Sequence, residues 1–202
     1  VTLSVGLNAQ VLTLKNHWTV EPRAGIKWQA TPKASFALAY GLHSRMEKMD
    51  VYFVRTRSTG TEPVNKDLDF SKAHHVMLSY GCRLSDNLNL KIEPYFQHLF
   101  DIPVIADSSY SVLNRVDFYV EEALKNKGKG RNFGVDVTLE RYLNDGVYYM
   151  ISGSLFSSKY KGGDGKWRNT KYNRQFIINC LGGKEWMLGQ DKQNILGINL
   201  KM

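Results

Sequence analysis

The chain has 202 residues, with 27 Lys or Arg against 19 Asp or Glu, so its net charge is +8. The basic residues are scattered, and no block of five or six like charges indicates a nucleic-acid-binding tail. The longest apolar runs, 36–40 and 147–151, have five residues, whereas a membrane-spanning helix needs about 20. Two well-separated cysteines, Cys82 and Cys180, exclude a disulfide-rich scaffold and a paired-cysteine zinc motif.

The first predicted elements alternate between apolar and polar residues with a period of two. Over residues 1–12 every odd position is apolar, and only one even position is. Over 18–30 the even positions are apolar and the odd ones are not, and the pattern recurs at 132–140 and less regularly at 88–100. This alternation predicts strands with one apolar and one polar face. Because no helical stripe of comparable length is present, the sequence predicts an all-β protein.

Nine strands are predicted from this pattern, with proline inside two of them. The strands cover about 1–13, 18–30, 35–44, 73–84, 88–101, 132–142, 147–158, 174–183 and 194–202. Proline cannot donate to a β-ladder, so Pro22 and Pro94 each predict a bulge or a place where pairing has ended.

The connections between these strands alternate in length. Short turns at 31–33, 85–87, 144–146 and 189–193 follow the second, fourth, sixth and eighth strands. Apart from the first connection, at 15–17, the others are long, at about 46–72, 102–131 and 159–173. This alternation is typical of an antiparallel up-and-down transmembrane β-barrel, with short periplasmic turns and long external loops.

Two tryptophans give the predicted barrel a scale. Trp18 and Trp28 share a face and, at about 3.3 Å per residue and a tilt near 45°, stand roughly 23 Å apart along the membrane normal. This spacing is close to the roughly 25 Å apolar band that aromatic girdles border. Bacterial barrels have even strand numbers, so nine strands between Val1 and Met202 predict part of a wall cut from a longer protein.

Several segments resemble the barrel of TonB-dependent outer-membrane receptors, in the branch with a carboxypeptidase-regulatory-like N-terminal domain. These segments are 21–28 (EPRAGIKW), 40–45 (YGLHSR), 91–97 (KIEPYFQ), 101–104 (DIPV), 126–128 (NKG), 132–136 (NFGVD), 153–160 (GSLFSSKY) and 167–170 (WRNT). The resemblance covers nearly the whole chain in order. It implies a 22-stranded barrel of which residues 1–202 are part of the C-terminal half, with the plug, the TonB box and the closing strands outside this chain.

The resemblance implies TonB-energised uptake of a scarce nutrient across the outer membrane of a Gram-negative cell. Its implied partners are outer-membrane lipid and lipopolysaccharide, TonB through the absent N-terminal region, and a small nutrient of unknown class, with no cofactor and no nucleic acid. Loops carry function on such scaffolds, so ligand contacts are expected from loop aromatics and cations. These candidates are Tyr52, Arg55, Arg57, Tyr110, Arg115, Tyr119, Trp167, Arg168 and Tyr172. For each, packing between loops or contact with lipopolysaccharide is the plainer interpretation.

Two other classes of protein remain open. A soluble β-barrel or sandwich that binds a ligand or carbohydrate would bury the alternating apolar face in a dry core. An outer-membrane enzyme would bring a serine, a histidine and an acid to one rim, but no nucleophile elbow is visible. No metal site is expected, because His74 and His75 point to opposite faces of a strand and His17, His43 and His98 look isolated.

Overall fold

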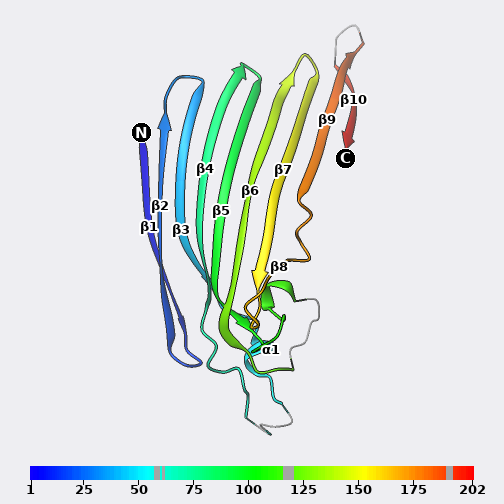
Figure 1. Ribbon diagram of the computed structural model, residues 1–202. Coiled ribbons are helices and arrows are strands. Elements are labelled where there is room, and N and C mark those ends of the chain that lie inside the picture. The colour runs from blue at the N-terminus through cyan, green and yellow to red at the C-terminus, as the bar shows by residue number, and fades with distance from the viewer. Residues whose placement is uncertain (57–59, 61, 116–120, 190–192) are drawn as a thin grey trace.

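The computed structural model describes residues 1–56, 60, 62–115, 121–189 and 193–202, and they form one antiparallel sheet of ten strands (Figure 1). The strands are β1 (Thr2–Leu12), β2 (His17–Gln29), β3 (Ala34–Arg45), β4 (Ser71–Ser85), β5 (Leu88–Val104), β6 (Lys125–Asn144), β7 (Val147–Lys161), β8 (Trp167–Asn169), β9 (Phe176–Leu188) and β10 (Asn194–Lys201). A short helix, α1 (Met49–Tyr52), and a 3-10 turn, η1 (Val112–Asn114), lie in the long connections. Neither has the length and apolar content that a helix needs to cross a bilayer.

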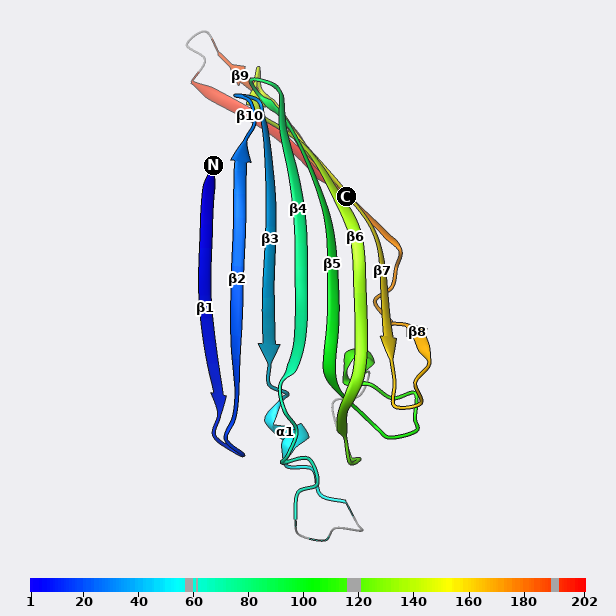
Figure 2. The ribbon, with the colours of Figure 1, turned by 60° about the vertical axis from the view of Figure 1, so that its left-hand side comes forward.

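Chain order and spatial order coincide in this sheet. The path runs β1-β2-β3-β4-β5-β6-β7-β9-β10 without closing on itself, and β8 pairs with the end of β7. Figure 2 shows the long strands side by side in a curved wall, with the long connections gathered at one end. The prediction of an all-β up-and-down sheet with short turns at one end and long loops at the other is confirmed.

All nine predicted strands are present, but the sequence pattern placed several strand ends wrongly and missed β8. The largest error is in β6, which begins at Lys125 and not near residue 132, while β5 continues to Val104 and β7 to Lys161. The start of β6 was missed because residues 125–131 alternate cations with asparagine and glycine, so no apolar alternation marks them as a strand.

The strand register places all the apolar stripes on one face of the sheet. Ile26, Leu38 and Leu78 lie opposite one another on β2, β3 and β4. Pro94, Val135 and Leu155 do the same on β5, β6 and β7. Side chains of directly opposed residues share a face, so these residues belong to one continuous surface, the apolar face. The other surface, the polar face, carries a row formed by Arg23, Gly41, His75, Gln97, Asn132 and Ser158.

The apolar face has the height of a membrane's hydrocarbon layer. On β6, Arg131 and Arg141 share the face of the apolar stripe and bracket its four side chains, which are Phe133, Val135, Val137 and Leu139. Ten residues at about 3.3 Å each and a tilt near 45° correspond to roughly 23 Å along the membrane normal. The apolar band of outer-membrane barrels is about 25 Å tall.

Aromatic rings border the band on both sides, as the spacing of the tryptophans predicts. Toward the short turns, the ring of Phe36 lies 5.9 Å from that of Trp28 and 5.0 Å from that of Tyr80. Toward the long loops, the hydroxyl of Tyr40 lies 2.9 Å from Nδ1 of His74, whose ring stacks 5.1 Å from that of Phe100. Rings with one apolar and one polar side suit the two interfaces of a bilayer.

Both prolines lie at breaks in hydrogen bonding within continuous strands. Pairing between β2 and β3 starts at Arg23, one residue after Pro22, so Pro22 faces no partner on β3 that requires its missing N–H. The β4–β5 ladder skips the positions around Pro94, between the Met77–Tyr95 and Tyr80–Ile92 pairs. The prediction that pairing ends at these prolines is confirmed for Pro22 on its β3 side, while β1 pairs through it, and at Pro94 the β4–β5 ladder is interrupted and then resumes.

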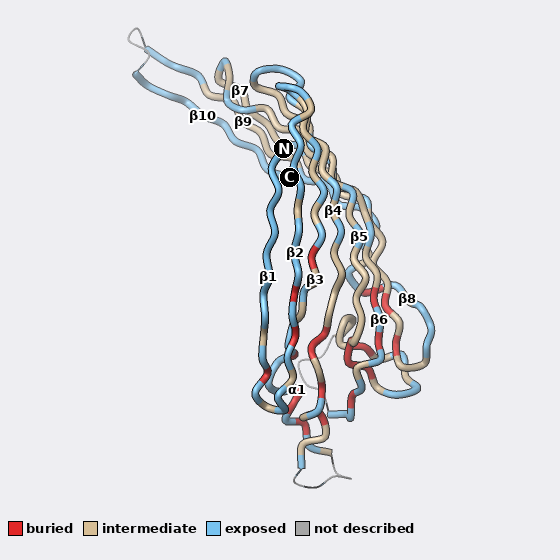
Figure 3. Tube along the Cα trace, turned by 90° about the vertical axis from the view of Figure 1, so that its left-hand side faces the viewer, coloured by how far each residue is buried: buried red, intermediate tan, exposed pale blue. Residues whose placement is uncertain are grey.

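The buried hydrophobic residues lie at the long-loop end, and those that belong to strands are at the strand ends there, namely Leu12, Ile102, Val104 and Tyr160. Figure 3 shows this end as the place where buried residues gather. The cluster joins the end of β1 to the 46–70 and 105–124 connections and consists of Leu12, Val51, Tyr52, Val54, Leu68, Phe70 and Leu124. We call it the loop core. It holds the long connections against the sheet and so positions whatever they present.

Candidate ligand-binding surface

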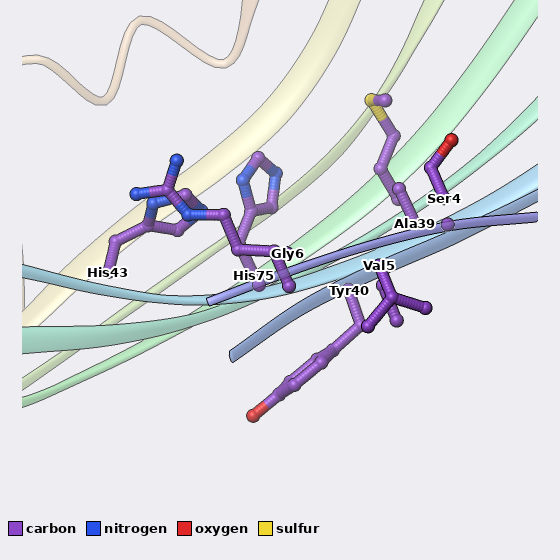
Figure 4. Close-up of a pocket in the computed structure, with 12 residues that line it drawn as sticks. Ser4, Val5, Gly6, Ala39, Tyr40, His43 and His75 are labelled. Atoms are coloured by element: carbon purple, nitrogen blue, oxygen red, sulfur yellow. The ribbon is translucent and has the colours of Figure 1, made fainter. Parts of the chain in front are cut away.

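Two adjoining hollows lie on the polar face, and both include His75 and Met77. The first, of about 430 Å³, lies over β2, β3 and β4 and is lined by Arg23, Gly41 and His43 in addition to the shared pair. Figure 4 shows His43 and His75 on one side of the sheet, with Val5 and Tyr40 pointing away on the other. The two imidazole ring centroids are 6.2 Å apart.

Gly41 makes room for the first of these imidazoles. A Cβ atom at residue 41 would stand 2.7 Å from Nε2 of His43, closer than side chains approach in proteins. His43 therefore folds back along its own strand, over the backbone of residue 41, and its ring reaches the hollow. The expectation that His43 is isolated is wrong, because the β3–β4 register puts Gly41 directly opposite His75.

The second hollow, of about 420 Å³, extends from β4 to β7 and is lined mainly by polar side chains. Its lining residues are His75, Met77, Glu93, Tyr95, Gln97, Asn132, Asp136, Phe156, Ser158 and Tyr172. Asn132 donates to Gln97 at 3.0 Å, and Ser154 donates to Asp136 just beside it. The Tyr95 hydroxyl lies where a Cβ at Gly134 would be only 2.9 Å away, so the glycine makes room for the tyrosine side chain.

A buried carboxylate fixes the edge of the first hollow. Glu21 is 1% exposed and accepts hydrogen bonds from Asn8 at 3.0 Å, Gln10 at 2.6 Å and the Ser44 backbone N–H at 2.8 Å. Arg23 pairs with the same carboxylate at 2.8 Å. Since β2 and β3 are unpaired at residue 21, this side chain takes over the connection between them. Buried charges need this degree of hydrogen bonding.

Two asparagines bind the long loops to each other. Asn65, 1% exposed, donates to the Glu122 carbonyl at 3.0 Å and accepts from the Leu124 N–H at 2.8 Å. Asn126 accepts from the N–H of Asp69 at 3.0 Å and donates to its carbonyl at 3.1 Å. The 46–70 connection therefore packs against the residues around the start of β6, and the two form one cap at this end of the sheet.

The structure separates the predicted loop candidates by their exposure. Tyr52 has no exposed surface and belongs to the loop core, where burial raises the pKa of its phenol. Tyr110 is partly buried against the same core, while Arg55 is exposed. Arg115 is mostly buried and pairs with Asp50 at 3.2 Å. The remaining two candidates in these loops, Arg57 and Tyr119, lie outside the described residues.

The third long connection holds three more candidates in different settings. Arg168 makes two hydrogen bonds to Asp164, at 2.9 and 2.5 Å, and this pairing lowers the pKa of the Asp164 carboxyl to about 2. Trp167 lies under the guanidinium of Arg131, 4.7 Å from its centre. Tyr172 is 61% exposed and lines the second hollow. Of the candidates that the structure describes, Tyr172 is the one that lines either hollow.

The hollows bring together residues that the sequence pattern did not single out. Arg23, His43, His75, Gln97 and Asn132 come from five strands, and only the register across the sheet shows that they are neighbours. In the described part of the chain, no group of three or more histidine, cysteine or acidic side chains could hold a metal ion. The surface can offer hydrogen bonds, imidazoles and a guanidinium to a polar ligand or to another part of the protein.

An open antiparallel sheet with one apolar face, one polar face and two aromatic borders has the features of a wall segment from an outer-membrane β-barrel. The chain has the fold of the barrel portion of TonB-dependent outer-membrane receptors.

Solved structures of such receptors match nearly the whole chain. The ferric-catecholate import receptor Fiu of E. coli K12 matches with a TM-score of 0.61 and 12% identity, over 87% of this chain and 23% of its own. The alcaligin outer-membrane receptor FauA of Bordetella pertussis matches with a TM-score of 0.59 and 14% identity, over 91% of this chain and 29% of its own. The FrpB iron transporter of Neisseria meningitidis matches with a TM-score of 0.59 and 12% identity, over 91% of this chain and 26% of its own. The chain thus spans about a quarter of these receptors, and no known sequence family or curated protein matches it by sequence.

Proposed function

We propose that this chain forms part of the barrel wall of an outer-membrane receptor that takes up a scarce nutrient with energy supplied through TonB. The observation that carries the proposal is the match of fold over 87–91% of the chain to three outer-membrane import receptors or transporters. In this assignment the apolar face meets lipid, and the polar face lines the lumen. TonB would act through a region outside these 202 residues.

The polar face suits a lumen that holds a plug better than an open pore. Cations and acids alternate across it, as in the pairs of Arg23 with Glu21 and of Lys91 with Glu93, each at 2.8 Å. A surface of mixed sign has no strong preference for one small ion. In such a lumen, the two hollows would bind side chains of the plug or the nutrient as it passes through.

The apolar face favours this proposal over a soluble binding protein. Leu3, Val5 and Leu7 are 70–76% exposed on β1, and no second layer of the described structure covers them or their neighbours. A soluble barrel or sandwich would bury such a surface, because contiguous apolar patches of this kind drive association in water.

Cysteine labelling in intact cells tests the orientation of the wall. In the full-length protein with Cys82 and Cys180 replaced, Ala106→Cys reports the long-loop end and Asp86→Cys the short-turn end. A membrane-impermeant maleimide should label the first in intact cells and the second only after the outer membrane is permeabilised. Val135→Cys, on the apolar face, should stay protected in both. Equal labelling of all three in intact cells would contradict a membrane location. Labelling of Asp86→Cys but not of Ala106→Cys in intact cells would mean that the short turns, and not the long loops, face the outside.

A further inference from the structure

The face that carries the apolar band continues toward the long loops as a surface of cations. On β6 the residues of this face read Lys125, Lys127, Lys129 and Arg131 before the stripe begins at Phe133. The neighbouring strand changes in the same way, from Leu155 to Lys159 and Lys161. The change occurs at the same height on both strands, since Arg131 lies opposite Lys159.

Four of these cations form two directly opposed pairs. Lys129 faces Lys161, and Arg131 faces Lys159, across the β6–β7 ladder. Like charges in directly opposed positions destabilise a sheet. Among the described residues no acidic side chain forms an ion pair with any of the four, although ion pairs occur elsewhere at this end, as between Lys72 and Asp101. The arrangement has a physical rationale if an anion from outside the chain lies between the pairs.

Arg131 is held in position for such an anion. Its guanidinium lies over Trp167, 4.7 Å from the ring centre, and Trp167 sits on β8 opposite Lys161. Its Nε is buried without a hydrogen-bond partner among the described residues. An arginine that stacks on an aromatic ring loses little freedom when its remaining N–H groups bind phosphate oxygens.

The height of this surface matches a lipid headgroup. Arg131 marks the edge of the apolar band on the side of the long loops. Lys129 lies two residues beyond it, about 7 Å further along the strand. That is the level of headgroup phosphates, because they lie just outside the hydrocarbon layer. Basic side chains at this level attract anionic lipids.

We propose that Lys129, Arg131, Lys159 and Lys161 form a binding site for the phosphate groups of a membrane lipid in the leaflet at the long-loop end. Trp167 positions Arg131 in this site. The inference rests on the proposed function, which makes that leaflet the outer one and its phosphorylated lipid a glycolipid. The site lies on the opposite face of the sheet from the two hollows, so it is separate from the nutrient's path.

Lipid titration of the full-length protein in detergent tests the site. The probes are bis-phosphorylated lipid A and the same lipid with its phosphates removed, with bound lipid counted by native mass spectrometry. The wild-type protein should prefer the phosphorylated form. Removing two cations in K129Q/K161Q should weaken that binding about 30-fold, since each cation near an anionic surface contributes roughly fivefold to the affinity. Binding of the dephosphorylated lipid should not change.

The control variant K27Q/K33Q removes the same charge from the polar face and from a short turn, and it should bind lipid as the wild type does. K129Q/K161Q should fold at least as well as the wild type, because it relieves the opposed charges, and the single variant K161Q gives a smaller effect of the same sign. Equal binding of both lipids, or unchanged affinity in K129Q/K161Q, would overturn the inference. So would inorganic phosphate displacing the lipid at equal concentration, which would indicate a free-anion site. Cysteine labelling tests the proposed function separately, since it does not depend on the lipid headgroup.

Discussion

Replacing Val135 with arginine tests whether the apolar face meets lipid. Val135 lies in the central row of the band, opposite Pro94 and Leu155, and four residues from Arg131. That separation is about 13 Å along the strand, or roughly 9 Å along the membrane normal at a tilt of 45°. A new guanidinium at this depth should cost about 2–4 kcal/mol, the value for arginine near the midplane of a barrel's lipid face. At 1.4 kcal/mol per factor of ten, the folding equilibrium should fall roughly 30- to 700-fold.

Refolding of the full-length protein into phosphatidylcholine vesicles across a urea series measures this cost. The folded fraction is read from the shift in gel mobility between heated and unheated samples. Ser152→Arg is the matched control, because it adds the same side chain on the polar face, opposite Thr138. The control should lose less than about 1 kcal/mol, as polar surface substitutions usually do. If Val135→Arg and Ser152→Arg cost the same, the assignment of the two faces is refuted.

Three further predictions concern the polar face and the loops. Glu21→Gln should lower the free energy of unfolding by about 1.5–3 kcal/mol in urea titrations, because a charged acceptor of several hydrogen bonds is lost; an unchanged stability would mean that Glu21 does not link β2 to β3. The folded-state pKa of Asp164 lies at about 2, below its usual 3.8. The pairing of Asp164 with Arg168 therefore stabilises the β7–β8 hairpin above pH 4, and this stabilisation is lost as the pH falls toward 2. The fluorescence of Trp167 should follow that loss, and Asp164→Asn should abolish the transition. Tyr52→Ala should open the loop core at a cost of about 3–5 kcal/mol, seen as faster cleavage of its loop by trypsin, whereas Tyr52→Phe should be cleaved at close to the wild-type rate.

The strands and their two faces could be predicted from the sequence because the signal is local. Val5 and Tyr40 have apolar neighbours two residues away on the same strand, and Figure 4 shows both on the same side of the sheet. Period-two alternation follows from strand geometry alone and needs no knowledge of the partner strand. The long loops could be predicted as loops, but their ends could not, because Lys125–Arg131 continues a strand without apolar residues.

The hollows of the polar face could not be predicted, because they depend on register. His43 and His75 are separated by a long connection, and a shift of one residue in the β3–β4 pairing would move one of them to the other face. The setting of each loop candidate could not be predicted for a different reason. Tyr52 has the composition of a ligand contact, but it is wholly buried among residues from three segments that only the folded loops bring together.

The first ten residues of β6 serve two unlike environments at once. On one side they carry the cations of the proposed lipid site, and on the other Gly128 and Gly130 lie so close to Val104 and Leu113 that a Cβ atom would stand 2.4 and 2.6 Å from them. A substitution in this stretch therefore has to satisfy both the proposed lipid site and the packing against the loops. This segment should therefore tolerate fewer substitutions than the exposed tips of the long loops.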